Sequence, residues 1–503
     1  MDFSTVRLPI KERNAFFFVF LASFNFYQHL KAINCLIMKL KTNNFLTTTL
    51  VGSGLFLLIS GTIDLDNLIN YEGQTQPNYI TKNNTPTSNP ITNAGATLGR
   101  VLFYDKQLSL NGSIACASCH KQTHAFGDDA IQSDGFDGGV TGRHSMRLVN
   151  SKFGTETNFF WDERANSLEA QSTMPIQDHI EMGFSGTNGQ PSIDSLINRM
   201  MSLPYYAPLF QKAFGSTQIT ESKMQKALAQ FVRSIQSYDS KYDTGRAQTG
   251  NDQQPFANFT QQENMGKQLF LAPPPQGGAG CAGCHRPPEF DIDPASRNNG
   301  VIGIAGSTNG TDLTNTRAPS LRDLFNQNGV LNGPLMHNGV FTTIDQALTH
   351  YNLVPQNPNN NNLDPRLQGP GGNLGLNQNQ KDAIAAFLKT LSGSAIYTNE
   401  RWSNPFDENG NITILPNTAE IISPTVNSIR IFPNPASEFV QVQYSTLGSQ
   451  ILIFDAQGKL VLKEKLSSTN QKIQIEHLQQ GVYILEIHDT IANKKLNKRF
   501  FKN

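Results

Sequence analysis

The sequence feature that most restricts this chain is the pentapeptide Cys-Ala-X-Cys-His, which occurs twice. One copy spans residues 116–120 and the other spans 281–285. The one further cysteine, Cys35, stands apart from both, so the 503-residue chain is not a scaffold held together by several disulfides. Two separated copies of one motif predict two related halves, each built around its own pentapeptide.

Cys-x-x-Cys-His is the signature for covalent attachment of c-type haem. Two thiols three positions apart can reach the two vinyl groups on one edge of a porphyrin, and the next residue supplies an imidazole to the iron. A zinc site would need ligands that converge from both motifs, and a redox dithiol needs no histidine after it, so haem c is favoured over both alternatives. The predicted attachment and axial residues are Cys116, Cys119, His120, Cys281, Cys284 and His285.

Charge and composition exclude some other functions. Lys plus Arg and Asp plus Glu number 40 each, so the formal net charge is zero, and a protein that binds nucleic acid by neutralising phosphates is not expected. Apolar residues make up 38% of the chain, which is typical of folded domains rather than of disordered chains. The length predicts two to four domains.

Residues 1–61 are predicted to be a signal or targeting segment. Lys39 and Lys41 precede an apolar run over 45–59, and small residues follow it, as in a secretory signal. Met38 lies directly before this pattern and is a candidate for the true start of translation. The run is shorter than the roughly 20 residues of a membrane-spanning helix, and a retained N-terminal anchor is the alternative. Export agrees with haem c, which is attached on an oxidising side of a membrane.

The middle of the chain is predicted to form two helical domains. Residues 62–94 are rich in Asn, Thr and Pro and are predicted to be a linker, and a second linker is predicted over 401–427. Between them, 95–250 and 251–400 each contain one haem motif. The clearest helix lies near 221–238, where apolar residues recur every three or four positions.

The chain changes character after the second linker. From 428 to 503, short runs of alternating apolar and polar residues are separated by turn sequences such as Asp-Ala-Gln-Gly (455–458). Several strands spaced in this way favour a small antiparallel sandwich. The predicted fold class is therefore mainly α, with two haem domains followed by a small all-β sandwich at the C-terminus.

From Leu98 to about Ser392 the chain resembles the bacterial di-haem cytochrome c peroxidases. The resemblance keeps the family's motifs in their order and implies two cytochrome-c-like helical domains. It also implies that the N-terminal haem reduces hydrogen peroxide and that the C-terminal haem supplies it with electrons. The stretches that carry the resemblance are LGRVLFYDKQLSLNGSIACASCH (98–120), FFWDERANSLEAQSTMPIQDHIEMGF (159–184), TRAPSLRDL (316–324) and GPLMHNG (333–339).

The resemblance assigns Met336 as the second axial ligand of the C-terminal haem. A His/Met pair raises the reduction potential, because a thioether favours ferrous iron, and this suits a centre that receives electrons. A related group of oxidases, which mature a tryptophan-derived quinone, has tyrosine at this position, so Met336 favours the peroxidase. The alternative is a methionine that only fills space in the core.

The resemblance also implies residues for the chemistry at the first haem. Glu181 matches the family's catalytic glutamate, and Gln171 matches a glutamine of the distal pocket that could orient peroxide. Peroxide must lose a proton from the oxygen that binds iron and gain one on the oxygen that leaves, and one carboxylate can do both. Trp161 matches a position between the haems, where an indole would shorten the path of an electron. The alternatives are a surface carboxylate and an ordinary packed tryptophan.

The loop after the first motif departs from the family pattern. Several relatives have a loop histidine that blocks the peroxidatic iron until the enzyme is reduced, but here Asp137 aligns with it and no histidine lies between Asp128 and Arg143. His144 follows immediately. Either the N-terminal iron is open at rest, which we favour, or His144 has taken the blocking role.

The resemblance also raises a calcium site between the domains. At the position of His144, relatives have an asparagine that helps to bind calcium between the domains. Arg317 and Pro319 match positions that bind the ion through backbone carbonyls, which any residue can supply. Three other histidines near these motifs, His124, His179 and His337, are expected to be structural or exposed rather than ligands.

Residues 429–503 resemble the C-terminal sorting domain of the type IX secretion system. The resemblance rests on IRIFPNPASEFVQV (429–442), ILIFDAQGKLV (451–461), LQQGVYILEI (478–487) and the basic end of the chain. Such domains are read by the outer-membrane exporter and are usually removed. The alternative is a permanent module for contact with carbohydrate or protein.

Together these features predict an exported di-haem c-type peroxidase. Hydrogen peroxide would be its substrate, and a small reduced cytochrome c or cupredoxin would deliver electrons near the C-terminal haem. The protein would pass the periplasm and reach the cell surface or the medium through the type IX machinery, and the family is often a homodimer. The alternatives are a di-haem oxidase that acts on a protein or an organic substrate, and a dihaem protein that only transfers electrons.

Overall fold

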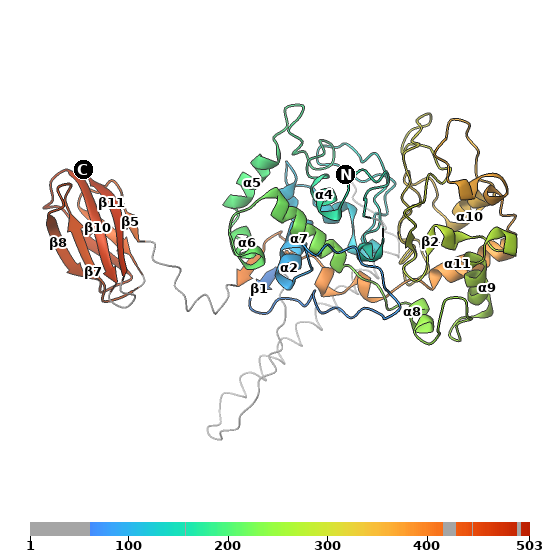
Figure 1. Cartoon of the computed structure of the whole chain (residues 1–503). Helices are drawn as coiled ribbons and strands as arrows, with labels where there is room; N and C mark the ends of the chain where they lie inside the picture. Colours follow the sequence, from blue (N-terminus) through green and yellow to red (C-terminus); the bar gives the residue numbers. More distant parts are fainter. Residues whose placement is uncertain (1–60, 156, 416–428, 445, 490–493) are drawn as a thin grey trace, which may run out of the picture. The chain divides into compact units, whose positions relative to one another are not determined.

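The computed structural model describes residues 61–155, 157–415, 429–444, 446–489 and 494–503. The predicted targeting segment, with Cys35 and Met38, lies outside the described residues except for Gly61, and so do residues 416–427 of the second predicted linker. α-Helices are confined to the region before residue 390, and the described chain from 429 onward is built of strands (Figure 1). This agrees with the predicted order of a mainly helical region followed by a β domain.

Ten α-helices lie within the described residues, and their order follows the chain. They are α2 (Asn93–Tyr104), α3 (Cys116–Cys119), α4 (Leu168–Thr173), α5 (Ile193–Ser202), α6 (Tyr206–Phe214), α7 (Glu221–Ser234), α8 (Lys241–Arg246), α9 (Gln261–Leu271), α10 (Ile344–Asn352) and α11 (Gln378–Lys389). Among these described helices, none is both long and apolar enough to cross a bilayer.

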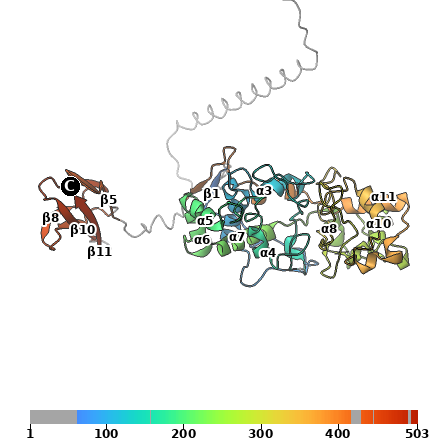
Figure 2. The ribbon, with the colours of Figure 1, turned by 90° about the horizontal axis from the view of Figure 1, so that it is seen from above.

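The first half of the helical region is organised by the pair α2 and α7, which lie side by side (Figures 1 and 2). Gly99 permits this close crossing, because a Cβ atom there would lie 2.0 Å from the carbonyl oxygen of Ala227. One turn further on, Phe103 and Phe231 pack with their ring centroids 5.1 Å apart. The crossing forms the centre of the first hydrophobic core.

The second half repeats this arrangement with α9 and α11. A Cβ atom on Gly266 would lie 1.8 Å from the carbonyl oxygen of Ala383, and the rings of Phe270 and Phe387 are 5.3 Å apart. In each half, one phenylalanine follows the glycine on its helix by four residues, and the other follows the alanine on the facing helix by four residues. Four residues are about one helical turn. The second hydrophobic core surrounds this pair, so each Cys-x-x-Cys-His motif has a core of its own.

The first predicted linker and the described part of the second, residues 401–415, pack against the first core instead of standing apart from it. Tyr71 is buried, and its hydroxyl donates to the carbonyl of Arg401 at 2.6 Å. Trp402 is buried as well, and its indole N–H donates to the carbonyl of Ser234 at 2.9 Å. Strands β1 (Thr62–Asp64) and β4 (Thr413–Leu415) pair in parallel and join the two segments. The large side chains of Tyr71 and Trp402 are shielded from water only when the two segments lie on the core.

The helix predicted near 221–238 ends earlier than its apolar stripe suggests. α7 stops at Ser234, and Ile235 is already extended. Asn150 accounts for this end, because its backbone N–H donates to the carbonyl of Ile235 at 2.9 Å and its side chain accepts from the N–H of Ser237 at 2.9 Å. Contacts across the chain therefore override the local periodicity.

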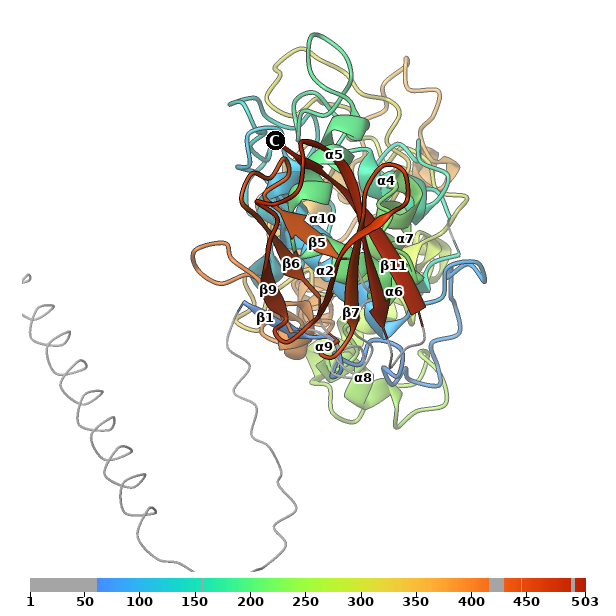
Figure 3. The same cartoon turned by 90° about the vertical axis from the view of Figure 1, so that its left-hand side faces the viewer.

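The C-terminal region is an antiparallel sandwich of two sheets, as predicted (Figure 3). One sheet has the order β5-β6-β9 and the other has the order β11-β10-β7-β8, and their inward side chains form a third hydrophobic core. The strands are β5 (Arg430–Phe432), β6 (Phe439–Gln443), β7 (Gln450–Phe454), β8 (Leu460–Lys465), β9 (Asn470–Gln474), β10 (Gly481–Asp489) and β11 (Lys494–Lys502).

The close crossing of α2 and α7 gives a test of the fold. We expect Gly99→Val to lower the free energy of unfolding by about 3 kcal/mol, because the new side chain would meet the backbone of Ala227. Chemical denaturation of the haem-loaded protein measures the loss. Gly250→Ala is the control, since a Cβ there would make only an ordinary contact of 3.9 Å with Oε1 of Gln254 and the backbone conformation is ordinary. Equal stabilities of the two variants would contradict the close crossing.

Candidate active site

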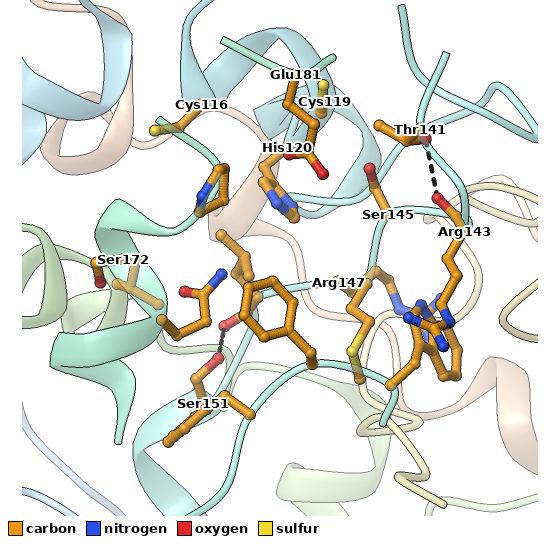
Figure 4. A pocket seen from close by; sticks show the side chains of 18 of the residues that line it. Cys116, Cys119, His120, Thr141, Arg143, Ser145, Arg147, Ser151, Ser172 and Glu181 are labelled. Carbon is orange, nitrogen blue, oxygen red and sulfur yellow. Dashed lines mark hydrogen bonds between the residues drawn. The ribbon is translucent and has the colours of Figure 1, made fainter. Parts of the chain in front are cut away.

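The first Cys-x-x-Cys-His motif opens onto a cavity of about 360 Å³. Helix α3 presents Cys116 and Cys119 to this cavity, and His120 follows at its C-terminus. Gln171 and Glu181 line the same cavity, although they lie 50 or more residues further along the chain. Figure 4 shows both cysteines, His120 and Glu181 grouped at one side of this space.

His120 is held in the orientation of a metal ligand. Its Nδ1 lies 3.2 Å from the carbonyl oxygen of Phe126, a residue whose backbone turns through a positive φ of 60° to present that oxygen. A donor bond from Nδ1 fixes the ring and leaves Nε2 as the metal-binding atom. Burial lowers the pKa of His120, so the imidazole is neutral at physiological pH, which is the form that binds iron.

The second motif lines a separate, larger cavity of about 540 Å³. Cys281 and Cys284 flank a short 3-10 turn, and His285 begins strand β2 (His285–Arg286), which pairs with β3 (Asp291–Ile292). Burial lowers the pKa of His285 to about 4, so this imidazole is also neutral. Met336 lines the same cavity as these three residues.

Met336 lies in a tight loop that directs it to the second cavity. The loop is closed by the bridge between Leu335 and Phe341, and Met336 itself has a positive φ of 71°. Its sulfur accepts a hydrogen bond from the side-chain amide of Asn299 at 3.2 Å, and the same amide lies 3.2 Å from the hydroxyl of Tyr351. Neither Asn299 nor Tyr351 lies near a recognisable motif, so sequence reasoning missed both.

The residues of both cavities fit covalent haem. All four cysteines are free thiols, and burial raises the pKa of Cys116 and Cys281 to about 12 and that of Cys119 to about 11. They are therefore neither ionised nor paired as disulfides and remain available for thioether bonds. Each cavity has a predominantly apolar lining, as a porphyrin requires.

Glu181 is placed in the first cavity by a turn that begins at Asp178. The carboxylate of Asp178 accepts from the backbone N–H groups of Ile180 at 2.8 Å and Glu181 at 3.0 Å. Burial is the main cause that raises the pKa of Glu181 to about 7, and the negative charge of Asp178 adds to it. A carboxyl group with this pKa can both take up and release a proton near neutral pH.

Gln171 reaches the first cavity from helix α4. Ser167 caps this helix by accepting from the backbone N–H of Ala170 at 3.1 Å, which sets where the helix begins. Gln171 is only partly buried, and it faces the cavity that also contains Glu181. Its amide can therefore donate to an oxygen of a small ligand there.

Trp161 lines both cavities. Its indole N–H donates to the carbonyl of His144 at 2.7 Å, and its ring packs edge-on against His337, with centroids 6.3 Å apart. The backbone N–H groups of Thr316 and Arg317 donate to its own carbonyl at 2.9 and 3.1 Å. Its role in the path of an electron stays a prediction.

Asp137 and His144, the two residues considered for blocking the first haem, have different surroundings. Asp137 is exposed and does not line either cavity. His144 is buried and lines both, and its Nδ1 lies 2.9 Å from the carbonyl oxygen of Ala130. This bond uses only Nδ1, so Nε2 of His144 remains for a further partner.

The other histidines have structural surroundings or are exposed. His124 Nδ1 lies 2.8 Å from the carbonyl of Asn332, and His337 Nε2 lies 2.9 Å from that of Gly303. His179 is exposed. Sequence reasoning also missed Arg147, which lines both cavities and donates to the carbonyl of Ser320 at 3.0 Å. Its guanidinium has further N–H groups that can donate to a carboxylate of a ligand in either cavity.

Comparison with known proteins agrees with this arrangement. The family model "Di-haem cytochrome c peroxidase" matches residues 93–252, and the model "Secretion system C-terminal sorting domain" matches 430–503. The methylamine utilization protein MauG of Methylorubrum extorquens is 32% identical over 314 residues, which are 61% of this chain and 80% of that protein. Cytochrome c551 peroxidase of Nitrosomonas europaea is 28% identical over 308 residues, which are 59% of this chain and 80% of the relative.

A solved structure extends the likeness to the fold. The crystal structure of a MauG-like protein associated with microbial copper homeostasis superposes with a TM-score of 0.54 at 27% identity and covers 66% of this chain and 99% of that one. Two Cys-x-x-Cys-His cavities on a helical scaffold define a di-haem c-type protein. The chain belongs to the di-haem cytochrome c peroxidase family, which includes the MauG proteins, and it ends in a type IX sorting domain.

The two motifs can be tested separately. We expect the double variant Cys116→Ser/Cys119→Ser to keep one covalent haem per chain, because only the first cavity loses its thioether bonds. Its matched control, Cys281→Ser/Cys284→Ser, should lose the other haem. The haem-to-protein ratio after acid–acetone extraction measures the result. Two covalent haems in either variant would contradict the assignment.

Proposed function

We propose that the protein is a di-haem c-type peroxidase, in which hydrogen peroxide, two protons and two electrons give two waters. The observation that carries this proposal is the difference between the two cavities. The first contains Glu181, a carboxyl group with a pKa of about 7, and the second contains the thioether of Met336. One site is thus equipped for proton transfer to a small oxidant, and the other for electron transfer.

In this proposal each half forms one haem domain. Residues 95–250 form the peroxidatic domain, with Cys116 and Cys119 as thioether residues and His120 as axial ligand. Residues 251–400 form the electron-transfer domain with the corresponding set Cys281, Cys284, His285 and the second axial ligand Met336. The repeated helix crossing at Gly99 and Gly266 supports this division, because equivalent helices flank the two cavities.

The chain's own groups handle the protons of the reaction. Haem iron supplies a binding position for peroxide and the electrons that break the O–O bond. With haem held by Cys116, Cys119 and His120, Glu181 as carboxylate would accept a proton from the bound peroxide. It then returns that proton to the departing oxygen, which leaves as water. The Gln171 amide orients the peroxide by donating to an oxygen, and the apolar lining limits access of other water.

Electrons enter at the second cavity and pass to the first. The thioether of Met336 stabilises the reduced state and so makes this site the acceptor for a small reduced cytochrome c or cupredoxin. Trp161 lines both cavities and gives the transfer a short path through packed atoms. Asp137 is exposed and lies outside the first cavity, so its side chain does not block peroxide there.

An oxidase that acts on a protein is the second candidate, because MauG proteins are among the relatives. A methionine rather than a tyrosine at position 336 favours the peroxidase. For export, we propose passage through the periplasm and delivery by the type IX machinery to the surface or the medium. The sorting domain at 430–503 supports this route.

The proposed function is tested by adding hydrogen peroxide stepwise to the anaerobic, reduced holoprotein in the presence of a reduced c-type cytochrome. We expect two molecules of cytochrome to be oxidised for each peroxide consumed, since the reaction needs two electrons. Absorption spectroscopy follows both species. No cytochrome oxidation would refute the peroxidase. An oxidised organic or protein product without a need for cytochrome would instead establish the oxidase.

The role of Glu181 predicts a specific pH dependence. A group with a raised pKa of about 7 is mostly protonated below that pH and cannot accept a proton, so kcat/KM for peroxide should fall as the pH drops through about 7. Glu181→Gln should keep both haems, lower turnover about 100-fold and abolish this acid limb. Glu408→Gln, at an exposed carboxylate, is the control. Turnover of Glu181→Gln within twofold of the parent protein would remove its assigned role.

A further inference from the structure

Arg143 joins the two halves of the helical region through a pair of aspartates. Its Nη1 lies 2.9 Å from Oδ2 of Asp162, which directly follows Trp161 in the first half. Its Nη2 lies 2.8 Å and its Nε 2.9 Å from Oδ2 of Asp312 in the second half. Nη2 also donates to the hydroxyl of Thr314 at 3.0 Å. One guanidinium therefore uses all three nitrogens to bridge the halves.

The network is shielded from water more than a surface ion pair. The side chains of Arg143, Asp162 and Asp312 are 26%, 16% and 14% exposed. Burial by itself would raise the pKa of Asp312, but hydrogen bonds from Thr314 and the charge of Arg143 hold it well below its usual value. Asp312 thus stays ionised, and a shielded guanidinium that binds two carboxylates restricts their separation more than an exposed pair does.

This network adjoins the three hydrogen bonds that Trp161 makes with His144, Thr316 and Arg317. His144, next to Arg143, accepts from the indole N–H, and the N–H of His144 donates to the carbonyl of His337 at 2.7 Å. The segment from Asp312 to Arg317 supplies the two backbone N–H groups that donate to the Trp161 carbonyl. Arg143 therefore anchors three points around Trp161. It directly precedes His144, it binds Asp162 directly after Trp161, and it binds Asp312 at the start of the segment 312–317.

The same region does not fit the calcium ion that the family resemblance raised. Calcium takes six to eight oxygen ligands, whereas the position of the family's asparagine holds His144, which offers a ring nitrogen in place of an amide oxygen. Arg317, one of the candidate ligands, directs its guanidinium to the carbonyl of Asn158. Its positive charge repels a divalent cation. No group of three or more His, Cys, Asp or Glu suited to a metal occurs within the part of the chain that the structure describes.

We propose that Arg143 takes the place of an interdomain calcium ion in this protein. It is a positioning residue: its ion pairs with Asp162 and Asp312 hold the halves in register and keep Trp161 between the two cavities without any metal. This proposal rests on the ion pairs and does not require that the substrate be peroxide.

The first test measures calcium in the purified holoprotein. We expect elemental analysis to find far less than one calcium per chain, and we expect the melting temperature to stay the same in EGTA and in millimolar calcium chloride. A bound calcium in each chain, or a melting temperature that falls in EGTA and is restored by calcium, would overturn the proposal.

The second test replaces the bridge itself. We expect Arg143→Met in the holoprotein to lower the melting temperature by about 4 °C and to slow electron transfer between the haems several-fold after photoreduction. Arg143→Lys, which keeps the charge but not the fork, should restore part of both. Lys381→Met is the matched control, because its 2.8 Å ion pair with Asp345 lies within one half.

The outcomes are distinct from those that test the peroxidase. A melting temperature and a transfer rate equal to those of the parent protein in Arg143→Met would refute the bridge. Should that variant fail to fold, Asp312→Asn removes one arm of the network, and a normal transfer rate in it would likewise refute the proposal. Neither measurement uses peroxide. The proposed function can therefore be refuted while the bridge is confirmed, and the bridge can be refuted while the proposed function is confirmed.

Discussion

The helical region depends on two close helix crossings, each made possible by a glycine. At Gly99 and at Gly266 a single additional carbon atom would collide with the backbone of the facing helix. The crossings bring Phe103 to Phe231 and Phe270 to Phe387, and residues of all four helices line the two cavities. Close packing at one point thus fixes the position of the wall against which each haem would lie.

The two halves share this scaffold but differ in what they add to it. The first half adds a turn that carries Glu181 and a short helix that carries Gln171. Both residues follow the motif in the sequence and line its cavity. The second adds the loop with Met336, supported by Asn299. A common frame with different loops gives one cavity a proton-transfer group and the other a soft ligand, which is the division of labour that the proposed function needs.

The contact between the halves is polar where it surrounds Trp161. A carbonyl of one half accepts from two N–H groups of the other, and Arg143 adds charge-assisted bonds on the same side. Hydrogen bonds of this kind depend on direction as well as distance, so they restrict how the halves can rotate against each other. The indole is consequently held by directional contacts rather than by apolar packing alone.

Glu181 is predicted only through the resemblance to a family. The sequence by itself predicts haem sites at the two Cys-x-x-Cys-His motifs, and it determined the order of a helical region and a β sandwich. These features are local: each depends on residues a few positions apart, or on a periodicity within one element. Tertiary structure alone decided that Tyr71 and Trp402 pack the supposed linkers onto the core, that Asn150 ends α7, and that Arg143 meets Asp312. Those contacts join residues far apart in the chain, and no local pattern records which distant backbone or charge a side chain will meet once the chain has folded.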